Sequence, residues 1–232
     1  MIINTRPEKL SRDLNYLAKS IDIELTNIPL TEVKIKDFLT QDEIELLKKI
    51  STFEGIVFTS SSACKYGIKK IQDFMEIDDL RSSIYAIGPA TKKELAEHGL
   101  ESFLPKEFNS KGIYKMLQDH RVDNILLVCG TNNEAILEEY FNRKIPKLEA
   151  YDVIPLKFNI AKLRVIPKAS SLLIFNLATF KLIEDEVEDL SKKNFTWICA
   201  SQRIGEYIEN RKAGTVVVSA TPSNEDMLKS CI

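Results

Sequence analysis

The sequence predicts an α/β protein in which helices cover parallel β-sheets. Short apolar runs rich in β-branched residues alternate with amphipathic stretches of about 10–15 residues, the pattern typical of βαβ units. The composition is that of a globular chain, with 44% hydrophobic and 28% charged residues. A length of 232 residues predicts one large or two small domains.

The order of the elements follows from this alternation. In the first predicted helix Leu10, Leu14 and Leu17 recur at helical spacing, and Pro7 suits a first turn. The predicted helices are 7–20, 41–52, 62–74, 91–98, 110–120, 132–143, 179–193, 202–211 and a last one from about 223. The predicted strands are 2–5, 23–26, 56–59, 84–87, 101–104, 125–128, 172–175, 195–199 and 216–218. Residues 147–158 are predicted to be extended, since Pro146 and Pro155 disfavour a helix.

An internal repeat predicts two similar halves. Residues 84–117 and 196–228 both give a strand, a polar turn, a helix, a short strand and a helix ending in Met-Leu. With only 8 Gly and 8 Pro and no Gly/Ser-rich linker, the connections between elements are expected to be short.

Charge and composition exclude several classes of function. The 32 basic and 34 acidic residues are interspersed and give a net charge of −2, which argues against a nucleic-acid partner. No apolar run approaches the roughly 18 residues of a membrane span, so neither a membrane segment nor a signal peptide is expected, and the expected location is cytoplasmic. No metal site is predicted, because the cysteines lack CxxC spacing and there are only two histidines. These residues are Cys64, Cys129, Cys199, Cys231, His98 and His120.

Small polar residues follow most of the predicted strands and open the next helix. In a parallel sheet such turns gather at one edge, where helix N-termini favour anions. Ser, Thr and Asn are also the preferred N-caps, so capping alone explains any single turn. No nucleotide-binding glycine motif is present. An FMN phosphate at 59–62 is a further alternative, which would make the chain a flavodoxin-like carrier.

Five segments in this order, together with Tyr151 and Pro155, resemble the uroporphyrinogen-III synthase family. The segments are INTRPE at 3–8, IPL at 28–30, FEGIVFTSSSA at 53–63, AIGPAT at 86–91 with Gly99 following, and SATPSNEDMLKS at 219–230. The resemblance implies two similar parallel-sheet domains, flavodoxin-like or Rossmann-like, joined by two extended linkers, with the active site in the cleft between them. Domain 1 would be discontinuous, from 1–32 and 159–232, domain 2 would be 36–147, and the linkers 33–35 and 148–158.

The resemblance also implies a reaction. Members of this family cyclise hydroxymethylbilane, a linear tetrapyrrole with eight carboxylates, to uroporphyrinogen III with inversion of ring D and loss of water. The implied enzyme is a monomeric lyase of haem biosynthesis that acts on this small molecule and needs no metal or organic cofactor. The alternative is a two-lobed, non-catalytic relative that binds a ligand in the cleft.

Residue by residue, Tyr151 matches the family's cleft tyrosine and is the expected catalytic residue, which assists departure of the hydroxyl; its alternative role is packing. The expected substrate-binding residues are Arg6, Thr59, Ser60, Ser61, Ser62, Gly88, Pro89, Ala90, Thr91, Gly130, Asn176 and Ser201. The sequence departs from the family pattern at Cys129, before Gly130, and at the turns containing Asn176 and Gln202. These departures are the support for the non-catalytic alternative.

Overall fold

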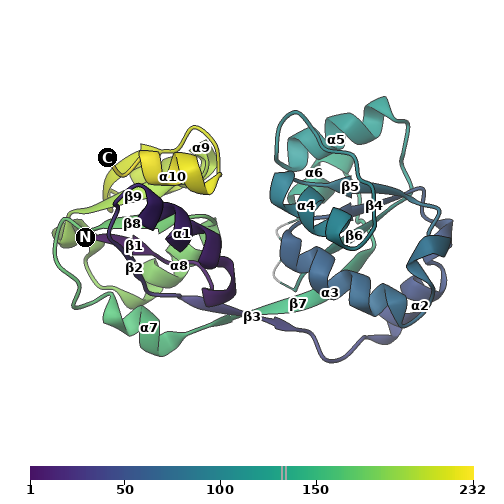
Figure 1. The fold of residues 1–232 in the computed structure, drawn as a ribbon, viewed down its shortest axis with the longest axis horizontal. Coiled ribbons are helices and arrows are strands. Elements are labelled where there is room, and N and C mark those ends of the chain that lie inside the picture. Colours follow the sequence, from purple (N-terminus) through teal and green to yellow (C-terminus); the bar gives the residue numbers. More distant parts are fainter. Residues whose placement is uncertain (132, 134) are drawn as a thin grey trace. The chain divides into compact units, whose positions relative to one another are not determined.

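The computed structural model describes residues 1–131, 133 and 135–232 (Figure 1). The chain forms two compact units, each with its own five-stranded sheet. Unit 1 comprises Met1–Glu32 and Ile154–Ile232, and unit 2 comprises Val33–Val153. Unit 1 is therefore assembled from both ends of the chain. Among the described residues, no helix is both long enough and apolar enough to cross a membrane.

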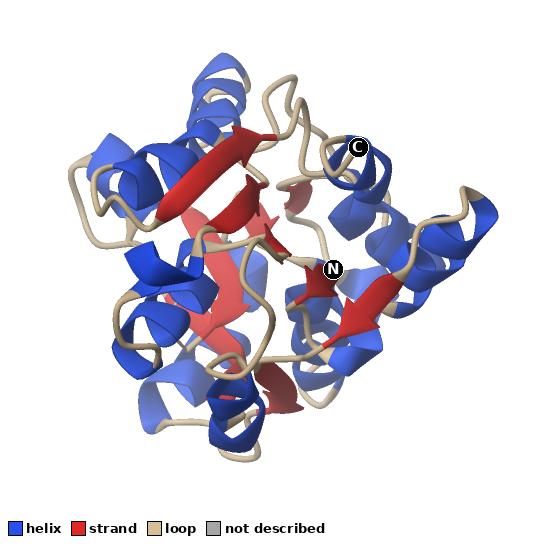
Figure 2. Cartoon of the chain, turned by 90° about the vertical axis from the view of Figure 1, so that its left-hand side faces the viewer, coloured by secondary structure: helices blue, strands red, loops and turns tan. Residues whose placement is uncertain are grey.

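The sheet of unit 1 has the strand order β10-β9-β8-β1-β2, and its strands pair in parallel. Its strands are β1 (Ile2–Asn4), β2 (Leu25–Asn27), β8 (Ser171–Ile174), β9 (Phe195–Cys199) and β10 (Gly214–Val218). Its helices are α1 (Arg12–Ser20), α7 (Lys157–Lys162), α8 (Leu177–Glu186), α9 (Gln202–Glu209) and α10 (Asn224–Lys229). Figure 2 shows helices flanking the strands of this unit. The arrangement directs the ends of β1, β8, β9 and β10 to one edge of the sheet.

Aromatic packing fills the core of unit 1. Trp197 is fully buried, and the rings of Phe180 and Phe195 meet it edge-on at centroid distances of 5.0 and 5.5 Å. The indole Nε1–H donates to the carbonyl of Ala213 at 3.0 Å, so the one polar atom of this ring is satisfied.

The sheet of unit 2 has the strand order β3-β7-β6-β4-β5. Its strands are β3 (Thr31–Ile35), β4 (Gly55–Phe58), β5 (Ser83–Ala86), β6 (Ile125–Gly130) and β7 (Lys147–Pro155). The pairs β4–β5, β4–β6 and β6–β7 are parallel. Lys36 N bonds Ala150 O and Leu156 N bonds Leu30 O, so the residue numbers run in opposite directions and β3 is antiparallel to β7.

Helices cover both faces of this second sheet. They are α2 (Gln41–Lys48), α3 (Ser61–Gln72), α4 (Pro89–Glu97), α5 (Ser110–Asp119) and α6 (Ile136–Phe141). On β4, Ile56 and Phe58 join one hydrophobic cluster while Val57 joins another, as the alternation of side chains along a strand requires. All four residues of β4 are buried, which explains why this strand appears as an uninterrupted apolar run.

The predicted α/β class is confirmed, and most predicted elements are found with ends shifted by a few residues. Three were wrong in detail. The helix predicted at 7–20 is a 3₁₀ turn, Glu8–Leu10, followed by α1, and the strand predicted at 101–104 is a single bridge between Phe103 and Tyr85. The helix predicted at 179–193 ends at Glu186, because Val187 takes an extended conformation, and Leu190–Lys193 forms a separate 3₁₀ turn.

Two other differences concern helix boundaries. The short helix α7 lies partly in the stretch predicted to be extended and is too short to show helical periodicity in the sequence. Of the helix predicted at 132–143, residues 132 and 134 lie outside the described residues, and α6 covers its described central part.

A buried charge cluster ties β3, α2 and β7 together in unit 2. Glu43, only 4% exposed, accepts hydrogen bonds from Lys36 Nζ at 3.0 Å, from the amide of Thr40 at 2.8 Å and from the amide of Glu149 at 3.0 Å. Burial alone would raise the pKa of Glu43, but these hydrogen bonds outweigh it and lower the pKa. The folded protein therefore holds Glu43 as a carboxylate.

Glu43→Gln is expected to lower the free energy of unfolding at pH 7 by about 2 kcal/mol, since bonds to a charged group are lost. Because the folded pKa lies below that of the unfolded chain, this contribution is present above about pH 4.3 and disappears as the pH falls through the folded pKa. Urea unfolding of wild type and variant should therefore differ at pH 7 and converge in acid. The control is Glu45→Gln, which removes an exposed pair with Lys48 and should change the free energy of unfolding far less than Glu43→Gln, because solvent screens an exposed pair. Equal effects of the two variants would contradict the prediction.

Candidate active site

The carboxyl edge of the sheet in unit 2 carries most of the predicted site residues. The strands β4, β5 and β6 run parallel and end there, and β7 lies beside β6. Four groups of predicted residues share this edge: Thr59, Ser60, Ser61 and Ser62 after β4; Gly88, Pro89, Ala90 and Thr91 after β5; Gly130 at the end of β6; and Tyr151 on β7. Residues from four separate parts of unit 2 are thus brought together.

A β-bulge turns Tyr151 toward this edge. In the β6–β7 ladder Cys129 pairs with Glu149, but Gly130 pairs with Tyr151, so one residue of β7 is skipped. Consequently Ala150 and Tyr151, although consecutive, both pack against the same hydrophobic cluster. The amide of Thr131 donates to the Tyr151 carbonyl at 3.0 Å and fixes the backbone beyond the bulge.

Gly130 provides the surface on which the Tyr151 ring lies. A Cβ atom at Gly130 would be 2.7 Å from Tyr151 Cε2 and 2.8 Å from Cζ, closer than real Cβ contacts. The residue before it, Cys129, is fully buried, and burial raises the pKa of its thiol to about 12. The thiol is therefore neutral and internal, and the departure from the family pattern at this position fills the core rather than supplying a reactive group.

The hydroxyl of Tyr151 has one polar partner within the described chain, Ser60 Oγ, at 3.1 Å. Burial raises the pKa of Tyr151, and the hydrogen bond to Ser60 opposes the rise only in part. The phenol therefore keeps its proton at neutral pH. A protonated phenol at a sheet edge can donate a proton or a hydrogen bond to a bound molecule.

Two helix N-termini lie at this edge, and that of α3 adjoins Tyr151 through Ser60. Helix α3 begins after Ser60, whose Oγ accepts from the amide of Ala63 at 3.0 Å. The Sγ of Cys64, in the first turn of α3, lies 3.7 Å from the carbonyl oxygen of Thr91 in α4 and so joins the first turns of the two helices. Partial positive charge at these termini favours carboxylates.

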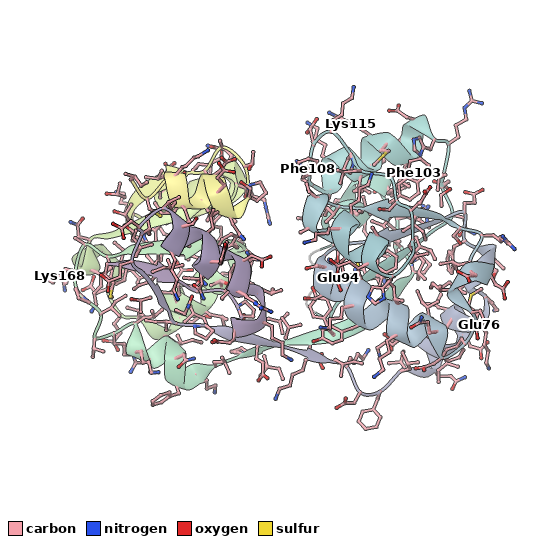
Figure 3. All side chains as sticks on the ribbon, viewed as in Figure 1. Glu76, Glu94, Phe103, Phe108, Lys115 and Lys168 are labelled. Carbon is pink, nitrogen blue, oxygen red and sulfur yellow. The ribbon has the colours of Figure 1, made fainter. Side chains whose placement is uncertain are left out.

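The two termini are capped differently. Helix α4 begins at Gly88 and Pro89, with no side-chain cap, so its first amides have no side-chain acceptor. Phe108, labelled in Figure 3, has the nearest atom to where a Cβ at Gly88 would lie, at 3.8 Å. At the start of α3, in contrast, Ser60 caps the helix, and the hydroxyl of the preceding Thr59 donates to Val128 O at 3.2 Å. The N-terminus of α4 is therefore the more open of the two to an anion.

The remaining predicted residues lie in unit 1, also at the carboxyl ends of parallel strands. Arg6 follows β1, Asn176 follows β8 and Ser201 follows β9. Asn176 caps α8 through its Oδ1, which accepts from the amide and the hydroxyl of Thr179 at 2.8 and 2.9 Å. Ser201 begins α9 without a side-chain capping bond.

Arg6 is a cation at this edge. Its Nη1 donates to Asn224 Oδ1 at 2.9 Å, and its guanidinium lies 4.4 Å from the centre of the Phe175 ring. Burial lowers its pKa, and the negative charge of Asp13 opposes this only in part. Since its two contacts are an amide oxygen and an aromatic ring, the guanidinium retains donors for a carboxylate.

Four contact residues were missed from the sequence: Tyr66, Thr131, Phe175 and Asn224. Tyr66 lies with its ring centroid 6.3 Å from that of Tyr151. Asn224 belongs to the 219–230 segment and Phe175 directly precedes Asn176. Their closeness in sequence to recognised segments could have indicated that these two residues lie at the site. In the part of the chain that the structure describes, no three His, Cys, Asp or Glu side chains are grouped so as to hold a metal ion.

Comparison with known proteins identifies the family to which the chain belongs. The model of uroporphyrinogen-III synthase HemD matches residues 13–229 of the chain. A mutant uroporphyrinogen III synthase from the extremely thermophilic bacterium Thermus thermophilus has the same fold with a TM-score of 0.68 at 11% identity, over 100% of this chain and 97% of that chain. The uroporphyrinogen-III synthetase of Helicobacter pylori gives a TM-score of 0.64 at 16% identity, over 99% and 97%. No match was found among curated proteins.

The family match extends over most of the chain, and the two structural likenesses cover it almost completely. The resemblance predicted from the sequence is therefore confirmed, and none of these comparisons favours the non-catalytic alternative. The chain belongs to the uroporphyrinogen-III synthase family, the cyclising lyases of haem biosynthesis.

Proposed function

We propose that this protein converts hydroxymethylbilane to uroporphyrinogen III with Tyr151 as the proton donor to the departing hydroxyl. The observation that carries the assignment of Tyr151 is its position: a partly buried, protonated phenol held at the sheet edge by Ser60, at the start of α3. Donation of the proton lets the hydroxyl leave as water and produces an azafulvene cation, which ring D then attacks.

The substrate's carboxylates are bound mainly by neutral groups and helix termini in this proposal. The chain carries a net charge of −2, so eight negative charges cannot be matched by a general basic surface. The first amides of α4 together with Thr91, and the residues Ser61 and Ser62 that open α3, supply hydrogen-bond donors in unit 2, whereas the amide and hydroxyl of Thr59 are both engaged by Val128 O. Holding the flexible chain so that its ends meet supplies much of the catalysis, since it reduces the entropy lost in ring closure.

The deciding experiment is isomer analysis. The protein is mixed with freshly made hydroxymethylbilane, and the products are oxidised to uroporphyrins and separated chromatographically. Type III product in excess of a protein-free control supports the proposal. Type I alone, the product of spontaneous closure, would refute it. We further propose that the enzyme acts as a monomer, without cofactor, in the cytoplasm. Size-exclusion chromatography with light scattering tests the monomeric state.

Arg6 is proposed to bind one substrate carboxylate in unit 1. Arg6→Ala is expected to raise KM about tenfold and to change kcat less than about twofold, because a charged hydrogen bond to a non-reacting group is lost. Arg6→Lys should recover part of the affinity, since it keeps the charge but not the forked geometry.

Arg12→Ala is the matched control, because Arg12 is an exposed cation of the same unit and its loss changes the net charge equally. An equal rise in KM for both variants would show that only net charge matters, and the specific role of Arg6 would be abandoned.

A further inference from the structure

Ser60 lies between the N-terminus of α3 and the hydroxyl of Tyr151. Its Oγ is 3.0 Å from the amide nitrogen of Ala63 and 3.1 Å from Tyr151 Oη. A serine hydroxyl has one proton to donate and two acceptor positions. The amide of Ala63 can only donate, so it occupies one of the acceptor positions.

Two arrangements remain for the bond to Tyr151. If the phenol donates to Ser60, its proton is directed into the protein and is withheld from a ligand. If Ser60 donates, the phenolic proton is free to point to the open edge. Only the second arrangement is compatible with proton donation by Tyr151.

We propose that Ser60 is a positioning residue, whose hydroxyl donates to Tyr151 Oη and so directs the phenolic proton toward the substrate's leaving hydroxyl. This inference rests on the proposed function. In the step concerned, the bond between the hydroxymethyl carbon and its oxygen breaks, the Tyr151 proton passes to that oxygen, and water leaves. The negative charge left on Tyr151 accepts the Ser60 hydrogen bond, and the proton released on ring closure returns to Tyr151.

Helix α3 strengthens this effect. Its 12 residues place a partial positive charge at the N-terminus, beside Ser60. The helix amide that bonds Ser60 Oγ polarises the hydroxyl, which becomes a better donor to the phenolate. This role differs from the substrate-binding role that the sequence predicts for Ser60, because here its proton is committed to Tyr151 and not to a substrate carboxylate.

The test compares variants that separate helix capping from donation to Tyr151. Ser60→Thr keeps both and should retain kcat within about threefold. Ser60→Ala loses both and should lower kcat about tenfold, with KM changed less than about twofold. Ser60→Asp caps a helix as well as serine does but cannot donate, so it should lower kcat about 30-fold while the urea midpoint is maintained.

Two further measurements guard against a purely structural explanation. Asn109→Ala removes the N-cap of α5, where Asn109 Oδ1 accepts from Gly112 N at 2.9 Å, and should leave kcat unchanged. In Ser60→Ala the alkaline limb of the kcat profile should move to higher pH, because the donated bond that favours the phenolate is gone.

Each outcome is decisive. If wild type forms type III product and Ser60→Asp is as fast as wild type, or if the alkaline limb does not move, the inference fails alone. If wild type forms only type I product, the proposed function fails and the inference falls with it. A selective loss of kcat in Ser60→Ala and Ser60→Asp, with rescue in Ser60→Thr, supports it.

Discussion

Tyr151→Phe is expected to lower kcat for formation of uroporphyrinogen III by about 100- to 1,000-fold, within the range typical of a removed general acid. The phenyl ring still packs on Gly130, and Ser60 still caps α3, so the fold should be maintained. Loss of one hydrogen bond should cost about 1 kcal/mol of unfolding free energy at most. KM should change little, because the lost proton transfer belongs to the transition state.

The measurement is the initial rate and isomer ratio at saturating hydroxymethylbilane. As catalysis slows, spontaneous closure competes, and the product should shift from type III to type I. Tyr66→Phe is the matched control, since the Tyr66 ring neighbours that of Tyr151, while among the described residues the tyrosine hydroxyl that bonds Ser60 is that of Tyr151. Retention of more than about a third of kcat in Tyr151→Phe would make Tyr151 a packing residue, the alternative that its strand position allows.

The edge of the sheet could be predicted from the sequence because its signals are local. Ser60 and Asn176 were recognisable as residues that open helices after apolar runs, and in a parallel sheet the positions after successive strands must share an edge. Because helix capping alone accounts for a serine or an asparagine at such a position, the sequence does not show whether these residues also have a second role. Both cap a helix in the structure, as local chemistry predicts, and only Ser60 also meets Tyr151.

The contacts that define the site could not be predicted in this way. Ser60 and Tyr151 are 91 positions apart, and their contact depends on a bulge at the end of β6 that no sequence pattern marks. Arg6 and Asn224 are 218 positions apart and meet because β1 lies inside a sheet completed by the C-terminal third of the chain. The resemblance to a family pointed to Tyr151, whereas its environment came only from the tertiary structure.

Gly130→Ala is expected to lower kcat about 100-fold through Tyr151 rather than through the backbone. Gly130 is not in the left-handed region, so an alanine is compatible with its backbone conformation. The new Cβ would lie 2.7 Å from the Tyr151 ring, which must move by roughly 1 Å, and a displacement of that size at a reacting group costs about 100-fold. Overpacking should also lower the unfolding free energy by about 1–3 kcal/mol.

The double variant Gly130→Ala/Tyr151→Phe separates these two effects. The phenyl ring occupies the same space as the tyrosine ring, so the stability loss caused by Gly130→Ala should be the same in both backgrounds. The activity losses should not be additive. Once the hydroxyl is absent, displacement of the ring no longer affects proton transfer. The double variant should therefore be as slow as Tyr151→Phe alone. Urea unfolding and initial rates on the four proteins measure both quantities. If the activity losses multiply instead, Gly130 acts on the substrate independently of Tyr151, and the flat contact between glycine and ring is only packing.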